Sequence, residues 1–468
     1  MPKRTNRDNP PEQKPGEEIP KKKKQRRKTE ENILLVVVPI DPTDPPPETE
    51  VEPEPKIEKK RIQPALDLTR HEMAYFKNLS IDEKHDLNLK MENLKLYSVE
   101  SEIPLKFRIL NLPVSQYVKT TVLKKIQGLE DSNEHHKVKN WVDAFLRIPF
   151  GKTIPLPVVL EDGKEKCSKF LKESRLTLDK AVYGMTNAKT QIMQVLSQWI
   201  ANPESVGNVI ALQGPAGVGK TSIARNGIAE ALCRPFEFFS LGGASDVSTY
   251  TGHSYTYEGS IWGRIADALM RSKCMNPVLY FDELDKISGT PHGEEIASML
   301  IHLTDRSQNT QFHDRYFSGI DFDVSQCLFV FSFNDVSLVN PILKDRMQII
   351  HCSGYSSKEK QTILEDYIWP DLLKRLKFST QDIKLSSESS KYLISEFSNE
   401  QGVRTLIRTA EMIITRLNML RIADEETMKI YKFYVQVEFP LQLTTSIIKK
   451  LLFDLEKKEP EPWRAMFN

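Results

Sequence analysis

Residues 208–221 read NVIALQGPAGVGKT, and this stretch decides the fold of the chain. The apolar run 209–212 predicts a strand, and the residues after it have the G-x-x-x-x-G-K-[ST] spacing of a phosphate-binding loop. Glycines let such a loop curl so that successive N–H groups point at phosphate oxygens. The predicted nucleotide-binding residues are Gly214, Pro215, Ala216, Gly217, Val218, Gly219, Lys220, Thr221 and Ser222. Ser222 opens a predicted helix, residues 222–232.

Two side chains of this loop predict its cofactors, ATP and Mg²⁺. Lys220 would reach the β- and γ-phosphates, and the hydroxyl of Thr221 would ligate Mg²⁺. A glycine-rich turn can match this spacing by chance. The strand pattern before the loop and the helix pattern after it favour the nucleotide interpretation.

The composition excludes several classes of protein. The 468 residues carry 65 basic and 64 acidic side chains, a net charge of +1, so no global charge favours nucleic acid or an anionic membrane. The five cysteines form no C-x-x-C pair, which argues against a disulfide framework and a zinc site. No apolar run approaches a membrane span, and the N-terminus lacks a secretory pattern. We therefore expect a soluble intracellular protein without a membrane partner, cytoplasmic or nuclear.

Residues 1–60 predict a disordered tail, because Pro, Glu and Lys dominate and aromatic residues are absent. Residues 21–28, KKKKQRRK, suit a nuclear address or a nucleic-acid contact, and equally a solvated charge run. Residues 33–38, ILLVVV, suit a strand added to the sheet of a partner, or an apolar tail without a role.

Residues 61–170 predict a mainly helical segment. Helical apolar spacing recurs in residues 114–126 and 138–146, and such stripes usually pack against a core. A third helix, residues 192–199, leads into the phosphate loop. Tyr183 and Gly184 precede that helix in an apolar, aromatic cluster that would either flank a nucleotide base or simply pack.

After the loop, strand and helix patterns alternate, which is typical of a parallel α/β sheet. Further strands are predicted at residues 236–241, 275–281 and 327–333. Asp282 and Glu283 follow the second of these, where a carboxylate could hold Mg²⁺ and another could act as general base. Asn334 follows the last strand, where its amide could hold the attacking water or sense the γ-phosphate. Arg346 could stabilise the transferring phosphoryl group of a neighbouring subunit, or form an ordinary surface ion pair.

Several blocks of the sequence resemble the ATPase module of Lon-type AAA+ proteases. They are GPAGVGKTS, LGGASDVSTYTGHSYTYEGSIWGRI, FDELDKI, ASMLIHLTDRSQNTQFHDRYF, LKDRMQII and NEQGVRTLIR, in the order and spacing of that family. KVKNWVDAFLRIPFG and LDKAVYGM resemble the helical segment that precedes the Lon ATPase core. The resemblance extends over roughly residues 100–455.

The resemblance implies an α/β AAA+ P-loop core with a parallel sheet at residues 171–355 and an α-helical lid at residues 356–455. The helical segment 61–170 and the disordered tail 1–60 precede them, and residues 456–468 form a C-terminal tail. It also implies an active ATPase in a homo-hexameric ring. The family roles fall on Lys220 and Thr221 (phosphates and Mg²⁺), Asp282 and Glu283 (second nucleotide motif), Asn334 (sensor 1), Arg346 (arginine finger) and Arg404 (sensor 2).

Tyr257 falls on the aromatic residue that Lon-type rings use to grip unfolded protein in the pore. Glu258 departs from the family, which usually has an aliphatic residue there, and would place carboxylates beside the grip. No Ser–Lys peptidase domain follows the lid in this sequence. We therefore expect ATP-driven unfolding or remodelling without peptide hydrolysis by this chain, or delivery of substrate to a separate protease. There are two alternatives. One is an ATPase that the basic block anchors to nucleic acid, and the other is an interaction protein in which nucleotide binding only controls assembly.

Overall fold

The computed structural model describes residues 63–66, 68–97, 103–127, 135–203, 209–257, 259–287 and 289–455. The predicted tail 1–60 with its basic block, Glu258, and residues 456–468 lie outside them. The chain divides into two compact units, Met1–Glu100 and Ser101–Asn468. The first unit holds helices α1 (Arg70–Asn78) and α2 (Ile81–Tyr97). Helix α1 begins at a capping box, in which Thr69 and Glu72 each bond the backbone N–H of the other.

The second unit is built on a five-stranded parallel sheet with the order β2-β3-β6-β1-β7. Its strands are β1 (Val209–Gln213), β2 (Phe236–Ser240), β3 (Val278–Asp282), β6 (Leu328–Phe333) and β7 (Gln348–His351). The first four confirm the strands predicted from the sequence. The edge strand β7 was not predicted. Because all strands run in one direction, the residues that follow β1, β3 and β6 meet at one edge of the sheet.

The sheet is buried on both faces, so its central strands read as continuous apolar runs. In β1, Val209 and Ala211 belong to one hydrophobic core, with Phe329 and Phe331 of β6. Ile210 and Leu212 belong to the other core. Side chains alternate between the faces of a strand, and each face therefore has its own layer of helices.

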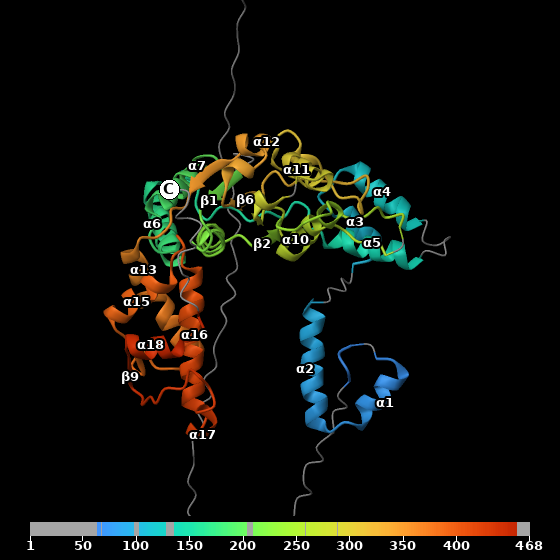
Figure 1. Cartoon of the computed structure of the whole chain (residues 1–468). Coiled ribbons are helices and arrows are strands. Elements are labelled where there is room, and N and C mark those ends of the chain that lie inside the picture. Colours follow the sequence, from blue (N-terminus) through green and yellow to red (C-terminus); the bar gives the residue numbers. More distant parts are fainter. Residues whose placement is uncertain are drawn as a thin grey trace, which may run out of the picture. The chain divides into compact units, whose positions relative to one another are not determined.

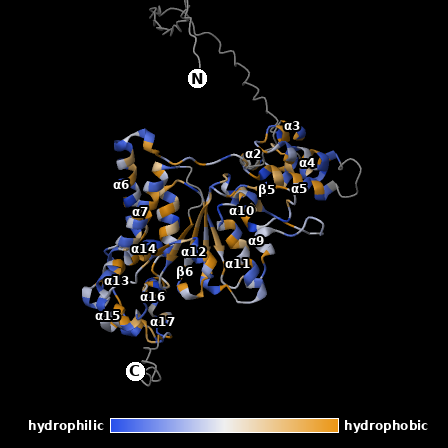
Figure 2. Cartoon of the chain, turned by 90° about the horizontal axis from the view of Figure 1, so that it is seen from above, coloured by the Kyte–Doolittle hydropathy of each residue, from blue (hydrophilic) through white to orange (hydrophobic). Residues whose placement is uncertain are grey.

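Helices cover the two faces, as Figure 2 shows for α6 and α7 on one side of β6 and α10 and α11 on the other. The first layer consists of α6 (Lys164–Ala181), α7 (Thr186–Ala201) and the helical stretch formed by α8 (Lys220–Ser222) and η2 (Ile223–Ala229). The second layer contains α10 (Arg264–Ser272) and α11 (Pro291–Thr304). Helices α4 (Gln116–Gln127) and α5 (His135–Arg147) lie beyond this layer and bury apolar side chains in the same hydrophobic core (Figure 1). In Figure 1 the sheet and these two helix layers run in colour from green at α6 and β1 through yellow at α11 to orange at the last strand.

Helix α5 confirms the predicted packing stripe. Trp141 and Phe145 are buried in the same core as α10 and α11, and their rings stack with centroids 5.6 Å apart. The indole Nε1 of Trp141 donates to the carbonyl oxygen of Tyr316 across 2.9 Å. A buried indole therefore has its polar group satisfied.

The lid follows β7 and has a core of its own. It consists of α13 (Ser357–Ile363), η6 (Leu364–Ile368), α14 (Trp369–Arg375), α15 (Ser387–Phe397), α16 (Arg404–Ile422), α17 (Glu425–Met428) and α18 (Thr445–Leu451). The structure adds a short parallel pair to the predicted helices, β8 (Ile383–Leu385) and β9 (Leu441–Leu443).

Short elements complete the second unit. They are α3 (Leu105–Leu110), η1 (Leu160–Asp162), α9 (Ser248–Thr251), η3 (Leu284–Lys286), η4 (Asn309–Gln311), the antiparallel pair β4 (Phe312–His313) and β5 (Asp321–Phe322), η5 (Val336–Leu338) and α12 (Pro341–Asp345). Within the described ranges, no helix combines the length and the apolar character that crossing a bilayer requires.

Candidate functional site

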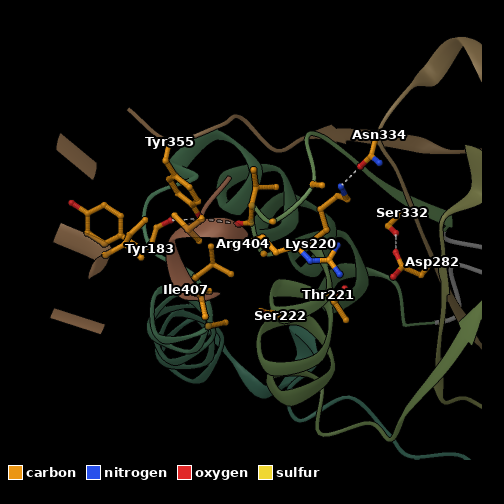
Figure 3. A pocket seen from close by; sticks show the side chains of 18 of the residues that line it. Tyr183, Lys220, Thr221, Ser222, Asp282, Ser332, Asn334, Tyr355, Arg404 and Ile407 are labelled. Atoms are coloured by element: carbon orange, nitrogen blue, oxygen red, sulfur yellow. Dashed lines mark hydrogen bonds between the residues drawn. The ribbon is translucent and has the colours of Figure 1, made fainter. Parts of the chain in front are cut away.

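A pocket of about 510 Å³ lies at the carboxyl ends of β1, β3 and β6, where core and lid residues converge. Parallel sheets bind ligands at this edge, and the volume is typical of small-molecule sites. Core residues lining it are Lys180, Ala181, Val182, Tyr183, Ala216, Gly217, Val218, Gly219, Lys220, Thr221, Ser222, Asp282, Glu283, Asp285, Ser332, Phe333 and Asn334. Residues after β7 and from the lid are Tyr355, Ile363, Tyr367, Val403, Arg404 and Ile407. Figure 3 shows how the labelled ones lie.

The phosphate loop has the predicted curled backbone. Gly217 and Gly219 have φ angles of +77° and +103°, which residues with a Cβ rarely adopt. A Cβ at Gly214 would collide with the carbonyl oxygen of Cys352. Helix α8 begins immediately afterwards, at Lys220. The N–H groups of such a turn and helix start favour an anion.

The ammonium of Lys220 connects three parts of the site. It donates to the carbonyl oxygens of Gly214 (2.6 Å) and Pro215 (3.1 Å) and to the amide oxygen of Asn334 (2.7 Å; Figure 3). Gly214 and Pro215 thus act through their backbones, although neither lines the pocket. Burial lowers the pKa of Lys220, partly offset by the nearby Cys352, Asp282 and Asp285.

Four oxygen-bearing side chains form a network beside the loop. The hydroxyls of Thr221 and Tyr280 are 3.1 Å apart, and Tyr280 donates to Oδ1 of Asp282 across 3.3 Å. Ser332 donates to the same carboxylate oxygen (Figure 3). Burial raises the pKa of Tyr280, so its phenol is protonated across the physiological range. Tyr280 and Ser332 were not predicted, because both lie inside apolar strands.

Glu283 lies in the left-handed backbone region, with φ of +60° and ψ of +47°, which is unusual for a residue other than glycine. Its carboxylate occupies the space beside Gly242, at the end of β2, where an added Cβ would collide with it. Strained backbone at a pocket edge is typical of functional residues, and Glu283 lines this pocket.

The backbone at Asn334 is fixed by hydrogen bonds to Asp285, a residue that was not predicted. Oδ2 of Asp285 accepts hydrogen bonds from the backbone N–H groups of Asn334 (3.0 Å) and Asp335 (3.1 Å). Asp285 is buried. These two bonds fix the turn after β6, and they place the Asn334 amide against Lys220.

The lid closes one side of the pocket. The backbone N–H of Val403 donates to the carbonyl oxygen of Gly217 (3.1 Å). The hydroxyl of Tyr355 donates to the carbonyl oxygen of Val218 (2.7 Å). Arg404, on which the sensor-2 role falls by the resemblance, follows Val403 and lines the pocket beside the loop (Figure 3). Tyr355, Tyr367 and Ile407 were not predicted.

Tyr183 lies at the aromatic end of the pocket, where its ring meets that of Tyr367 edge-on at 5.9 Å. The buried Lys189 of α7 fixes this turn: its ammonium donates to the carbonyl oxygen of Val182 (2.6 Å) and pairs with Asp179 (2.8 Å). Gly184 has φ of +65° and serves the turn, but it does not line the pocket.

Two predicted residues lie elsewhere. Arg346 does not line the pocket of its own chain: its guanidinium donates to the carbonyl oxygen of Ile301 and pairs with Asp305 at 2.8 Å. Tyr257 lies on a surface turn with 69% of its area exposed. Glu258, the next residue, is outside the described residues.

The donor set fits a nucleoside polyphosphate with a hard cation. Curled glycines and Lys220 provide N–H groups for phosphate oxygens. Thr221 and Asp282 provide oxygen atoms, the ligands that Mg²⁺ prefers. Both residues are hydrogen-bonded to the hydroxyl of Tyr280, which keeps them close together. The aromatic end at Tyr183 and Tyr367 offers planar surfaces to a base.

Comparison with known proteins agrees with this geometry. Residues 210–355 match the family described as "ATPase family associated with various cellular activities (AAA)". A Lon protease homolog of Acanthamoeba polyphaga mimivirus is 33% identical over 76% of this chain and 35% of its own length. The Lon protease of Chlamydia pneumoniae is 34% identical over 67% of this chain and 37% of its own length. The mitochondrial Lon protease homolog of Caenorhabditis elegans is 32% identical over 78% of this chain and 39% of its own length.

The chain thus spans 35–39% of the length of these relatives. The similarity covers the AAA domain and much of the chain beyond it. The chain therefore contains an AAA ATPase domain, the kind of domain that binds and hydrolyses ATP, and most of its length forms a Lon-like module.

Proposed function

We propose that this module hydrolyses ATP and uses the energy to unfold or remodel protein chains. The observation that carries the proposal is the shared pocket: the phosphate loop and the lid are joined by the bond between Val403 and Gly217. A nucleotide that touches both parts favours one lid position over another. Hydrolysis would then change the lid position and move whatever the module grips.

The site residues divide the chemistry among them. Lys220 and the loop N–H groups bind phosphates, and Thr221 and Asp282 hold Mg²⁺, which supplies charge neutralisation at the phosphates when bound. Glu283 acts as general base toward the attacking water. Asn334 orients that water, and Arg404 contacts the phosphates from the lid.

The proposal includes a homo-hexameric ring. Arg346 is outside the pocket of its own chain, so it could serve only a neighbouring pocket. Tyr257 is exposed on its turn, where its ring would grip a passing protein chain. Glu258 beside it would favour basic or less apolar substrates.

ATP turnover and substrate unfolding test the proposal separately. The full chain is mixed with ATP and a green fluorescent protein bearing an unstructured tail, and both phosphate release and fluorescence are followed. Glu283→Gln should abolish both signals, whereas Tyr257→Ala should keep turnover and lose unfolding. Equal phosphate release by wild type and Glu283→Gln would refute the ATPase assignment. Gel electrophoresis of the same samples tests the expectation that this chain does not cleave its substrate.

A further inference from the structure

Tyr280 occupies a position where packing alone requires no hydroxyl. The residue lies in β3, fully buried, and its ring packs between those of Phe236 (5.5 Å) and Phe238 (5.8 Å) of β2. A phenylalanine would fill this space. A buried hydroxyl is costly unless it is hydrogen-bonded. Its partners are Ser332, Thr221 and Asp282, and the last two are the residues proposed above as Mg²⁺ ligands.

The hydrogen bonds of this group can run in only one direction if Thr221 faces a cation. A threonine oxygen that turns a lone pair to a metal must donate its own hydrogen elsewhere. The phenol oxygen of Tyr280 lies 3.1 Å away and can accept it. The phenol hydrogen then goes to Oδ1 of Asp282, a carboxylate oxygen that only accepts.

The hydrogen bonds that the carboxylate of Asp282 accepts all go to one of its two oxygen atoms, Oδ1. Tyr280, the hydroxyl of Ser332 and the backbone N–H of Glu283 all donate to Oδ1. Within the described residues, Oδ2 accepts no hydrogen bond from the protein. Oδ2 is therefore the oxygen available to a ligand in the pocket that Asp282 lines.

We propose that Tyr280 is a positioning residue, whose hydroxyl relays a hydrogen bond from Thr221 to Asp282 and so orients both toward the Mg²⁺ of the bound nucleotide. The inference rests on the proposed nucleotide site and deepens it. Thr221 and Asp282 come from different elements, α8 and β3, and Tyr280 is the group that connects them.

The test is the Mg²⁺ dependence of nucleotide binding, which requires no turnover. Calorimetry gives the dissociation constant of a non-hydrolysable ATP analogue for the full chain in saturating Mg²⁺ and in EDTA. The dissociation constant in EDTA divided by the constant in Mg²⁺ measures how much the metal strengthens binding. Loss of one hydrogen bond predicts that Tyr280→Phe lowers this ratio about three- to tenfold. Its affinity in EDTA should match wild type, which also shows that the variant is folded.

Tyr250→Phe is the matched control. Tyr250 is a buried tyrosine whose hydroxyl donates to the carbonyl oxygen of Ser240 (2.8 Å), outside the pocket. Its removal should leave the ratio unchanged. Ser332→Ala, which removes a second donor to Oδ1, should lower the ratio as Tyr280→Phe does and gives a second variant if that one fails to fold.

Two outcomes overturn the inference. One is a ratio for Tyr280→Phe equal to that of wild type, which includes an equal fall of both affinities, and the other is the same change of the ratio in Tyr250→Phe. A wild-type chain that binds no nucleotide would instead refute the proposed function itself. The failure of the positioning role is thus distinguishable from the failure of the site.

Discussion

The backbone N–H of Val403, at the start of lid helix α16, donates to the carbonyl oxygen of Gly217 in the phosphate loop across 3.1 Å. This approach requires glycines on both sides. A Cβ at Gly217 would lie 2.8 Å from Cβ of Arg404, and a Cβ at Gly402 would collide with the carbonyl oxygen of Ala216. The lid therefore rests on the loop by backbone contact, and changes in one part displace the other.

Gly402→Ala should weaken ATP binding because the added methyl group pushes the lid off the phosphate loop. Overpacking of about 1–3 kcal/mol corresponds to an increase of about five- to 150-fold in the dissociation constant. Calorimetric titration with a non-hydrolysable analogue measures it. Gly289→Ala is the matched control, because a Cβ there meets no atom within 4 Å. An unchanged constant for Gly402→Ala would show that the lid contact does not contribute to binding.

Tyr183→Ala should weaken binding of ATP but not of tripolyphosphate. The ring lies at the aromatic end of the pocket beside Tyr367, away from the phosphate loop, so its loss removes contact with the base alone. Loss of one aromatic contact predicts an increase of about three- to tenfold in the dissociation constant of ATP. Competition against a fluorescent nucleotide measures both ligands.

Tyr117→Ala is the control for that experiment, since Tyr117 is a tyrosine of α4 with 71% of its area exposed, outside the pocket. Equal weakening of ATP and tripolyphosphate by Tyr183→Ala would mean that the substitution disturbs the whole site. The packing interpretation of the 182–185 cluster would then be preferred.

Asp314 predicts a pH dependence of stability. The carboxylate is buried and accepts the backbone N–H groups of Gly263 (2.8 Å) and Tyr316 (2.9 Å), and burial raises its pKa to about 6 from 3.8. Between these values the folded chain keeps a proton that the unfolded chain has released. The contribution of Asp314 to the free energy of unfolding is therefore fully present below pH 3.8 and is lost as the pH rises to about 6.

Asp314→Asn removes this titration. Relative to wild type, the free energy of unfolding of the variant should rise by roughly 2–3 kcal/mol between pH 4 and pH 7, whatever its constant offset. Urea denaturation at several pH values measures the difference. A difference that is independent of pH, or that changes in the opposite direction, would contradict the buried, protonated carboxyl group.

The sequence predicts the central strands of the sheet because they are continuous apolar runs, followed by the phosphate loop after β1 and by polar site residues at the ends of β3 and β6. Edge strand β7 was missed because it spans only Gln348–His351, with polar residues at both ends. A four-residue strand that pairs with a neighbour on one side only is too short to show a clear hydrophobic pattern. Its existence depends on pairing with β1, which no local signal reports.

The spacing of residues in the sequence predicts the phosphate loop, and the two carboxylates after an apolar strand predict Asp282 and Glu283. Tyr280 was hidden because a tyrosine within an apolar strand reads as packing. Asp285 was hidden because its role is to bond backbone N–H groups of a distant turn. Tyr355 and Tyr367 become part of the pocket only when the lid returns to the core, and that contact is set by tertiary packing.

Arg346 gives a test of the ring. Its guanidinium is tied to Asp305 and the carbonyl oxygen of Ile301, with 27% of the side chain exposed, and it lies outside its own pocket. If Arg346 serves the pocket of a neighbour, Arg346→Ala should bind ATP as wild type does but lose most of its turnover. Asp305→Asn, which removes the ion pair and keeps the guanidinium, should retain turnover.

Mixing two inactive variants separates action on a neighbour from a role within one chain. Arg346→Ala has an intact pocket, and Lys220→Ala has an intact arginine, so a neighbouring pair rebuilds one complete site. Random assembly at equal amounts should restore about a quarter of the wild-type turnover, because each site needs one subunit of each kind in the right order. If Arg346 acts only through its bonds to Asp305 and Ile301, every complete pocket still lacks its support, and the mixture stays as inactive as its parents. Phosphate release from mixed and unmixed samples distinguishes the two, because only a ring with shared sites gains activity on mixing.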